Sequence, residues 1–196
     1  MDINKLADVI LNGELAIIPT DTVYGIVADA TSFEAVDKVF KIKKRDYKKP
    51  LIIMVSSVEM LLKYVLCVDE IEKELIEKYW PGKLTILFKR NKNVLDIITN
   101  GGDLVGIRFP DNKELINLMN KIDRPLVSTS ANISNCDTVV DINMIEEELK
   151  NKVSYIYDGG ILDNLASTIV TIVGGKIKII RDGELSSQLK NNFDCE

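Results

Sequence analysis

Apolar residues recur along the chain with two spacings that alternate, one typical of amphipathic helices and the other of buried strands. The helical spacing of three and four is clearest after Ser32, a good capping residue, at positions Phe33, Val36, Val39 and Phe40. Further helices are predicted at Leu6–Ile10, Val58–Leu66, Asp69–Tyr79, Asp111–Lys121 and Ile142–Leu149. Short apolar runs predict strands at Leu15–Ile18, Leu51–Val55, Leu84–Phe88, Leu104–Ile107, Leu126–Ser128, Ser154–Tyr157, Thr168–Val173 and Lys176–Ile180. Strands that alternate with helices indicate an α/β fold.

The end of the chain departs from this alternation. Gly174 and Gly175 separate the last two predicted strands, and such a pair is a signal for a two-residue hairpin turn. The sheet is therefore expected to be mixed, with both parallel and antiparallel neighbours. We expect one domain over residues 1–185 and a frayed polar tail over residues 186–196.

The composition excludes several kinds of chemistry. The 196 residues contain no histidine, which removes every mechanism with a histidine base and every histidine-ligated metal. The three cysteines lie far apart without a CxxC pair, so neither a zinc site nor a redox site is expected. A sparse, odd number of cysteines fits a reducing compartment, so a cytoplasmic location is expected. Neither a signal peptide nor a membrane-spanning segment is expected. A formal charge of −5 argues against a dedicated nucleic-acid binder.

Polar side chains gather at the ends of two predicted strands. Thr20, Asp21 and Thr22 follow the first strand, and Ser128–Asn132 close a later one. Open α/β sheets bind ligands at the carboxyl ends of their strands, so these groups are candidates for a binding site. They are equally well explained as turn and capping residues that bond their own backbone. No GxxxxGK[ST] loop and no GxGxxG after a strand occurs, so a bound nucleotide would be held in another way.

Positive charge is concentrated in one segment and in few arginines. Residues 43–49 contain five cations. Cations after a helix interact favourably with its dipole and are usually solvated, so they need no functional explanation. A local basic cluster on an acidic chain also suits a small anionic substrate. We favour the second interpretation slightly. The chain has twenty lysines and only five arginines, so each arginine is a candidate for planar, bidentate anion binding. They are Arg45, Arg90, Arg108, Arg124 and Arg181.

Taken in order, the motifs resemble those of the YrdC/TsaC family, the threonylcarbamoyl-adenylate synthases. The resemblance runs from about Gly13 to Gly183, and it is to the short, single-domain form of the family. Each motif alone is weak, but their combination and spacing are specific. They are PTDTVYG at 19–25, KxR and KPL at 43–51, WPGKLT at 80–85, VGIRFP at 105–110, STSANIS at 128–134, and STIV followed by RDG at 167–183.

The resemblance implies both a fold and a reaction. The fold would be α/β, with a twisted mixed sheet and flanking helices around a large cationic cavity. The reaction would consume L-threonine, bicarbonate and ATP and release threonylcarbamoyl-AMP and pyrophosphate. Mg²⁺ would arrive with the ATP, without a metal site built by the protein. Partner proteins would transfer the threonylcarbamoyl group to tRNA, so stable tRNA binding by this chain is not required, and no membrane is involved.

The resemblance also implies roles for individual residues at matched positions. The residues implied to bind L-threonine are Thr22, Met54, Arg108, Ser128 and Ser167, with Arg108 on the carboxylate. The residues implied to bind ATP are Arg45, Lys49, Leu104, Ser130, Asn132, Thr138 and Arg181, of which Leu104 contributes its backbone. Lys43, Arg45 and Arg181 would be catalytic, because they would neutralise the charge of the phosphates.

Two positions depart from the family pattern. Many relatives carry a histidine where this chain has Met54, so that contact with threonine is lost or replaced. Relatives usually continue Gly-x-Pro after SANIS, whereas this chain continues Asn135-Cys136-Asp137, which alters the loop that contains Thr138.

The lack of histidine is compatible with the implied chemistry. The amine of threonine and bicarbonate or CO₂ give a carbamate, whose anionic oxygen attacks the α-phosphate in line and expels pyrophosphate. Catalysis would then rest on holding anions together and neutralising their charge.

Two alternative functions stay open. One is a carbamoyl-adenylate former that uses carbamoyl phosphate, normally part of a larger multidomain chain. The other is a non-catalytic RNA-binding module, which the acidic composition and the lack of interleaved aromatics disfavour.

Overall fold

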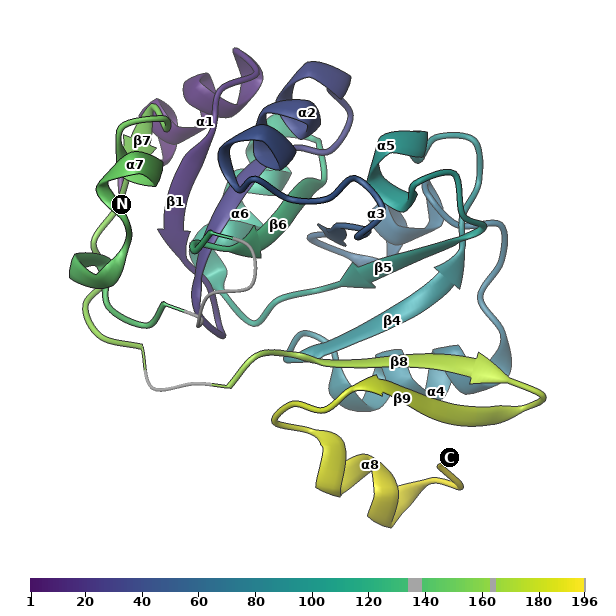
Figure 1. Cartoon of the computed structure of the whole chain (residues 1–196). Coiled ribbons are helices and arrows are strands. Elements are labelled where there is room, and N and C mark those ends of the chain that lie inside the picture. Colours follow the sequence, from purple (N-terminus) through teal and green to yellow (C-terminus); the bar gives the residue numbers. More distant parts are fainter. Residues whose placement is uncertain (134–138, 163–164, 196) are drawn as a thin grey trace.

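The computed structural model describes residues 1–133, 139–162 and 165–195. Within these ranges nine strands form a single sheet with the order β7-β1-β2-β6-β3-β5-β4-β8-β9 (Figure 1). The strands are β1 (Ala16–Pro19), β2 (Tyr24–Asp29), β3 (Ile52–Met54), β4 (Leu84–Lys89), β5 (Leu104–Arg108), β6 (Leu126–Ser130), β7 (Tyr155–Ile156), β8 (Thr168–Val173) and β9 (Lys176–Arg181). Three neighbouring pairs are parallel, namely β1–β7, β3–β5 and β4–β8, and the others are antiparallel. The predicted α/β fold with a mixed sheet is confirmed.

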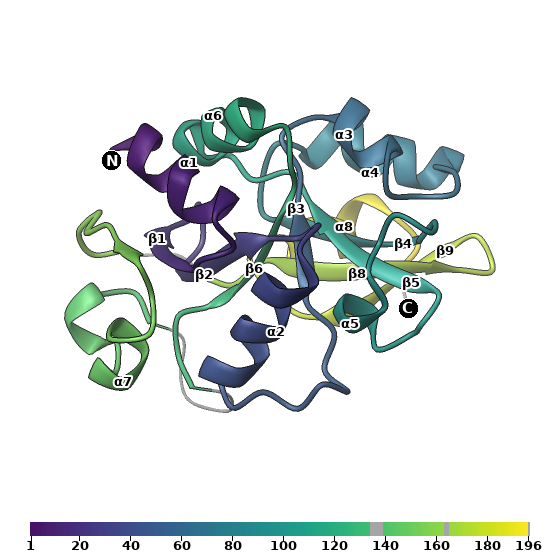
Figure 2. The same ribbon diagram turned by 90° about the horizontal axis from the view of Figure 1, so that it is seen from above.

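Helices cover both faces of this sheet. They are α1 (Ile3–Leu11), α2 (Phe33–Ile42), α3 (Val58–Leu62), α4 (Glu70–Tyr79), α5 (Asp96–Thr99), α6 (Lys113–Ile122), α7 (Glu147–Lys150) and α8 (Ser186–Asn192), with a 3₁₀ turn at Ile142–Met144. Seen from above, α1, α6, α3 and α4 lie on one side of the sheet, and α2 and α5 lie on the other (Figure 2). In the part of the chain that the structure describes, no helix has the length and apolar character needed to cross a bilayer.

Local signals in the sequence explain where the helices begin. Ser32 Oγ accepts a hydrogen bond from the backbone N–H of Ala35 at 3.2 Å, as a capping serine does. Asp69 and Glu72 form a reciprocal capping box at the start of α4, with both bonds at 2.8 Å. On α2 the predicted apolar face is buried, except that Phe33 in the first turn is 55% exposed.

The main difference from the predicted elements is β2. Its residues, Tyr24–Asp29, are all buried and pair with β1 on one side and β6 on the other. The run directly follows the polar residues 20–22 with no glycine or proline between them, so no turn signal marks where a new strand begins. The polar residues therefore occupy a hairpin turn between two antiparallel strands. The short helix α5 was also missed, and the helix predicted at Ile142–Leu149 is split into the 3₁₀ turn and α7.

The C-terminal segment differs from the predicted frayed tail, because residues 186–192 form helix α8. Leu189 is fully buried, and the ring of Phe193 lies 6.3 Å from the ring of Tyr79. Two apolar residues, Leu189 and Phe193, among polar ones give too weak a periodic signal to predict a helix. The hairpin turn between β8 and β9 is confirmed, since Gly174 and Gly175 have φ values of 59° and 79°, as such a turn requires.

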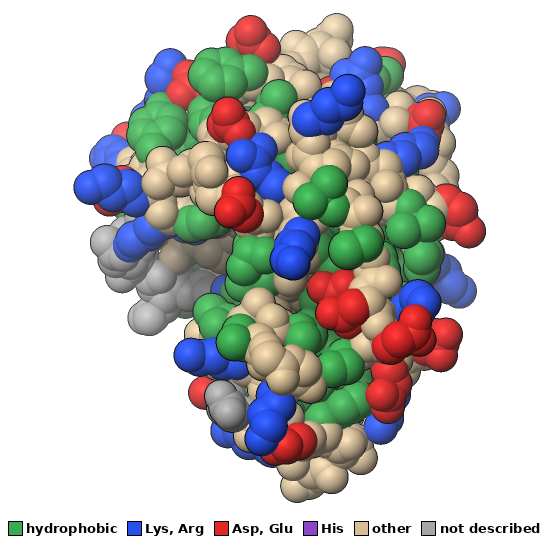
Figure 3. All heavy atoms as spheres, turned by 90° about the vertical axis from the view of Figure 1, so that its right-hand side faces the viewer, with side chains coloured by type: hydrophobic (Ala, Val, Ile, Leu, Met, Phe, Trp, Pro, Cys, Tyr) green, Lys and Arg blue, Asp and Glu red, His purple; other side chains and the backbone are tan. Residues whose placement is uncertain are grey.

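The surface drawn in Figure 3 carries charges of both signs. Lysine and arginine side chains are interspersed with acidic ones over most of this face, and acidic side chains gather toward its lower right. This face therefore presents no extended basic surface of the kind that binds nucleic acid through its phosphates.

Candidate active site

A pocket of about 220 Å³ lies over the middle of the sheet. Its walls come from the β1–β2 turn and the start of β2, from the segment that leads into β3, from β3, β5 and β6, from the start of β8 and from the end of β9. Arg45, Arg108 and Arg181 line it, whereas Arg90 and Arg124 are not among its described lining residues. The volume is below the roughly 300–1,000 Å³ of typical small-molecule pockets. The arginines expected to bind anions are thus brought together in a small cationic pocket.

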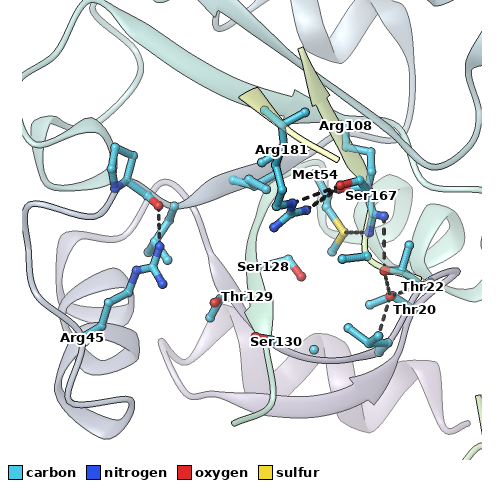
Figure 4. Close-up of a pocket in the computed structure, with 17 residues that line it drawn as sticks. Thr20, Thr22, Arg45, Met54, Arg108, Ser128, Thr129, Ser130, Ser167 and Arg181 are labelled. Carbon is cyan, nitrogen blue, oxygen red and sulfur yellow. Dashed lines mark hydrogen bonds between the residues drawn. The ribbon is translucent and has the colours of Figure 1, made fainter. Parts of the chain in front are cut away.

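The pocket has two chemically different ends (Figure 4). Arg108, Thr22 and Met54 lie together at one end, and Arg45 lies at the other. Arg181 and the hydroxyl of Ser128 lie between the two ends. A molecule with two anionic groups could therefore span the pocket.

The β1–β2 turn is shaped by the hydroxyl of Thr20. This hydroxyl donates to the carbonyl of Val23 at 2.8 Å, accepts from the N–H of Thr22 at 3.1 Å and lies 2.9 Å from the hydroxyl of Thr22. Gly25 follows, and a Cβ there would lie 3.1 Å from both Ser128 Oγ and Thr20 Cγ2. Thr20 therefore builds the turn, as the capping interpretation predicts, and the turn presents Thr22 to the pocket.

Arg108 ends strand β5 and is 5% exposed. Its Nη1 donates to Thr22 Oγ1 at 3.3 Å, its Nη2 to Met54 Sδ at 3.8 Å, and Nη2 lies 3.2 Å from Asp21 Oδ1. Burial lowers the pKa of the guanidinium and the charge of Asp21 acts in the opposite direction, but an arginine remains charged at neutral pH. A buried cation in this position favours an anionic ligand.

The other two arginines are held by backbone carbonyls. Arg45 donates from Nε to the carbonyl of Lys49 at 3.0 Å and from Nη2 to that of Pro50 at 2.8 Å. Arg181 donates to the carbonyl of Ser167 from Nε at 3.1 Å and from Nη2 at 2.8 Å, and Nη2 also donates to Ser167 Oγ at 2.9 Å. Burial lowers the pKa of both guanidinium groups, and Arg108 lowers that of Arg181 further. Neutral carbonyls orient these cations but leave their charge available to an anion.

Comparison with known proteins identifies the family. The Sua5/YciO/YrdC family profile, described as telomere recombination, matches residues 8–183. The chain belongs to the Sua5/YciO/YrdC family. The YrdC/TsaC resemblance read from the sequence is thereby confirmed.

Individual members of the Sua5/YciO/YrdC family are similar over nearly the whole chain. The threonylcarbamoyl-AMP synthase of Pyrococcus abyssi is 32% identical over 180 residues, which are 91% of this chain and 53% of that protein. A Methanocaldococcus jannaschii protein that carries the same name provisionally is 39% identical over 91% of this chain and 84% of its own length. The crystal structure of P. abyssi Sua5 complexed with L-threonine superposes with a TM-score of 0.91, at 30% identity, over 99% of this chain and 58% of that one. The chain thus spans little more than half the length of the P. abyssi protein.

The five residues expected to bind threonine lie together in this structure. Thr22, Met54, Arg108, Ser128 and Ser167 all line the pocket. Ser167 is 4% exposed, and its hydroxyl lies 2.9 Å from that of Thr85 in the WPGKLT motif, which connects this motif to the site. Met54, the departure from the family's histidine, contacts Arg108 through its sulfur.

The residues expected to bind the nucleotide are only partly gathered at the pocket. Arg45, Ser130 and Arg181 line the pocket. Lys49 is exposed beside it, and Leu104 is 42% exposed at the start of β5, the end opposite Arg108. Thr138 lies outside the described residues.

Lys43 lies behind the pocket wall. It is 1% exposed, and its Nζ donates to the backbone carbonyls of Ser130 and Asn132 and to Asn132 Oδ1. Asn132 is itself 4% exposed and is not among the described lining residues. Within the described ranges, no cluster of three aspartate, glutamate or cysteine side chains is suited to hold a metal ion.

No specific role was predicted for three residues of the candidate polar groups. Thr20 and Thr129 line the pocket, but alternation along a strand does not say which hydroxyl faces a ligand. Asp21 was a candidate only as a member of the polar group after the first strand, and its pairing with Arg108 was not predicted. A carboxylate between two threonines, far in sequence from any arginine, gives no signal of that pairing.

Proposed function

We propose that this chain is a threonylcarbamoyl-AMP synthase, which forms threonylcarbamoyl-AMP and pyrophosphate from L-threonine, bicarbonate and ATP for the threonylcarbamoyladenosine (t6A) modification of tRNA. The observation that carries the proposal is the division of one pocket into a buried arginine among hydroxyls and two further arginines held by neutral backbone carbonyls. Membership of the family and the similarity to a threonine complex support it.

The amino acid binds at the end formed by Arg108, Thr22 and Met54. The guanidinium of Arg108 holds the carboxylate, because its remaining N–H groups form the fork geometry that matches two carboxylate oxygens. The hydroxyls of Ser167 and Ser128, which also line the pocket, bind the amine or the side-chain hydroxyl of threonine.

The nucleotide occupies the side of Arg45 and Arg181. Its α-phosphate lies toward Arg181, between the two ends, and the rest of the nucleotide extends out toward Arg45 and Lys49. A pocket of about 220 Å³ accommodates an amino acid and a phosphate group, so part of the nucleotide must lie outside it. Mg²⁺ enters as part of the substrate MgATP, bound to the triphosphate.

The reaction needs little proton transfer from the protein. Threonine and bicarbonate or CO₂ give a carbamate, and its oxygen attacks the α-phosphorus as the bond to pyrophosphate breaks. Arg181 and Arg45 stabilise the charge that develops on the phosphoryl oxygens, and Arg108 fixes the nucleophile in place. Lys43 contributes by holding the backbone at Ser130 and Asn132, next to this path.

The product is then consumed elsewhere. The adenylate diffuses to partner proteins that transfer the threonylcarbamoyl group to tRNA, and no stable tRNA complex of this chain is needed. The reaction takes place in the reducing cytosol, a location that Cys67 and Cys195, both free, support.

The test of the proposed function is the release of pyrophosphate from ATP in CO₂-depleted buffer. Release is expected only when threonine and bicarbonate are added together, because neither alone supplies an anionic oxygen beside the α-phosphate. Carbamoyl phosphate alone, with ATP, should give no release. Release with carbamoyl phosphate would instead favour the carbamoyl-adenylate activity. No release under any combination, together with tight RNA binding, would favour the binding module.

The hydroxyl-lined end predicts a clear order of amino-acid affinities. Threonine should bind most tightly, serine less tightly, and valine at least about tenfold more weakly than threonine, because each polar group that valine leaves unpaired costs about 1–3 kcal/mol. Isothermal calorimetry with the three amino acids measures this order. Equal affinities for valine and threonine would contradict the proposed position of the amino acid.

A further inference from the structure

Behind the amino-acid end of the pocket lies a buried ion pair between Asp21 and Arg108. The two side chains are 5% and 6% exposed, and Asp21 Oδ1 lies 3.2 Å from Arg108 Nη2. Asp21 does not line the pocket among the described residues, whereas Arg108 does. The carboxylate therefore contacts the guanidinium from outside the pocket lining.

The other contacts of Arg108 are too weak to fix its orientation. An arginine has five N–H donors. In the described part of the chain its hydrogen bonds are one of 3.3 Å to Thr22 Oγ1 and one of 3.8 Å to a thioether sulfur, which is a weak acceptor. Arg45 and Arg181, in contrast, are each fixed by short bonds to backbone carbonyls. For Arg108 the strongest available partner is Asp21.

Asp21 is itself anchored. Its Oδ2 accepts from the backbone N–H of Asp111 at 3.2 Å, which ties the β1–β2 turn to the segment that follows β5. Its Oδ1 is buried and makes no aligned hydrogen bond among the described residues, although Arg108 is within ion-pair distance. One oxygen is therefore held by the backbone, and the other is left facing the guanidinium.

We propose that Asp21 is a positioning residue for threonine binding: its carboxylate orients the Arg108 guanidinium so that the free N–H groups point into the pocket. This proposal rests on the proposed function, because it takes the carboxylate of threonine as the ligand of Arg108. Asp21 acts only through Arg108 and does not touch the amino acid.

The proposal has a consequence for pH. Burial raises the pKa of the Asp21 carboxyl above its ordinary value, although the positive charges of Arg108 and Lys83 act in the opposite direction. The carboxylate orients Arg108 only while it is ionised. Threonine affinity should therefore be full at pH values above this pKa and fall as the pH drops through it. The carboxylate of free threonine stays ionised over that range, so the loss would come from the protein.

The decisive variant is Asp21→Asn. It keeps an oxygen for the N–H of Asp111 and nearly the same shape, but it removes the charge. We expect the Kd for L-threonine, measured by calorimetry at pH 7.5, to rise about tenfold, because the charge-assisted contact that orients the guanidinium is lost. The acid-side loss of affinity should be absent from this variant.

A matched control is Asp29→Asn. Asp29 is also buried, also pairs with an arginine, Arg124, and also accepts a hydrogen bond from a backbone N–H, that of Thr31 at 2.8 Å. It lies at the far end of β2 from the pocket. Its substitution should leave the Kd for threonine within about twofold of the wild type, so that a general effect of losing a buried pair is distinguished from a loss of positioning.

A second readout needs no ligand. With only five arginines, the guanidinium Nη–Hη signals of the chain can be assigned by NMR, and those of Arg108 are identified by their loss in Arg108→Lys. In the wild type the Nη2 protons, which face Asp21 Oδ1, should exchange slowly with water, and in Asp21→Asn this protection should be lost. A threonine Kd and an exchange rate that are both unchanged in Asp21→Asn, or a Kd that falls, would overturn the proposal while the proposed function stands. If the wild type does not bind threonine, both are wrong.

Discussion

Replacement of Arg181 by alanine is expected to lower the rate of pyrophosphate release by about a hundredfold or more, because removal of one oriented donor from a developing oxyanion has an effect of that size. The side chain is held by three bonds to Ser167 and lies between the two ends of the pocket, where the α-phosphate would react. Arg45→Ala should have a similar but smaller effect, since Arg45 lies farther along the nucleotide. Steady-state rates at saturating threonine and bicarbonate measure both.

The matched control for these variants is Arg90→Ala. Arg90 also bonds to backbone carbonyls, those of Gly102 and Val94, and pairs with Asp96, but it lies outside the pocket. The activity of this variant per folded molecule should equal that of the wild type. Wild-type turnover in all three variants would show that the phosphate positions are wrong.

Replacement of Lys43 by methionine is expected to lower the free energy of unfolding by about 3 kcal/mol, since it leaves the buried carbonyls of Ser130 and Asn132 without their charged donor. Denaturation by urea, followed by fluorescence of Trp80, measures this change. The neighbouring Lys44→Met is the control, because Lys44 makes an exposed ion pair with Glu148 at 2.9 Å. Loss of this ion pair should barely change the urea concentration at the midpoint of unfolding.

The same variant separates two roles for Lys43. A lysine that touches the phosphates could be removed with loss of activity and little loss of stability, as the family resemblance implies for a catalytic residue. If Lys43 instead holds the pocket wall, as its burial indicates, its removal lowers the free energy of unfolding. Full stability with lost activity in Lys43→Met would therefore contradict the role read from the structure.

Sequence alone predicted those parts of the site that rest on rare residues. Arginine is scarce in a lysine-rich chain, and three of the five arginines line the pocket. Strands such as β4, β5 and β8 were predicted because short apolar runs between turn residues have one common explanation. The hairpin at Gly174 and Gly175 was predicted because its turn needs positive φ at two successive residues.

What sequence could not predict depends on contacts between distant residues. In the sequence nothing distinguishes Lys43 from the other cations of its cluster. Only the fold brings its Nζ to backbone carbonyls that are almost ninety residues away along the chain. Asp21 and Arg108 are paired across 87 positions by the parallel and antiparallel strands between them. β2 was missed because its first residues were read as the end of a polar motif, whereas the sheet buries all six of its residues.

The two arginines assigned to the phosphates come from opposite parts of the chain, Arg45 from the segment after α2 and Arg181 from the end of β9. Strand β8 reaches the site by parallel pairing with β4, and β9 is held by β8 alone among the named strands. During synthesis the amino-acid end, apart from Ser167, is therefore complete once β6 has formed, while Arg181 is still to be made. On the proposed function, a nascent chain that ends before this hairpin would bind threonine weakly and would lack Arg181 for the reaction with ATP. Activity would therefore require that the β8–β9 hairpin has been made and paired with β4.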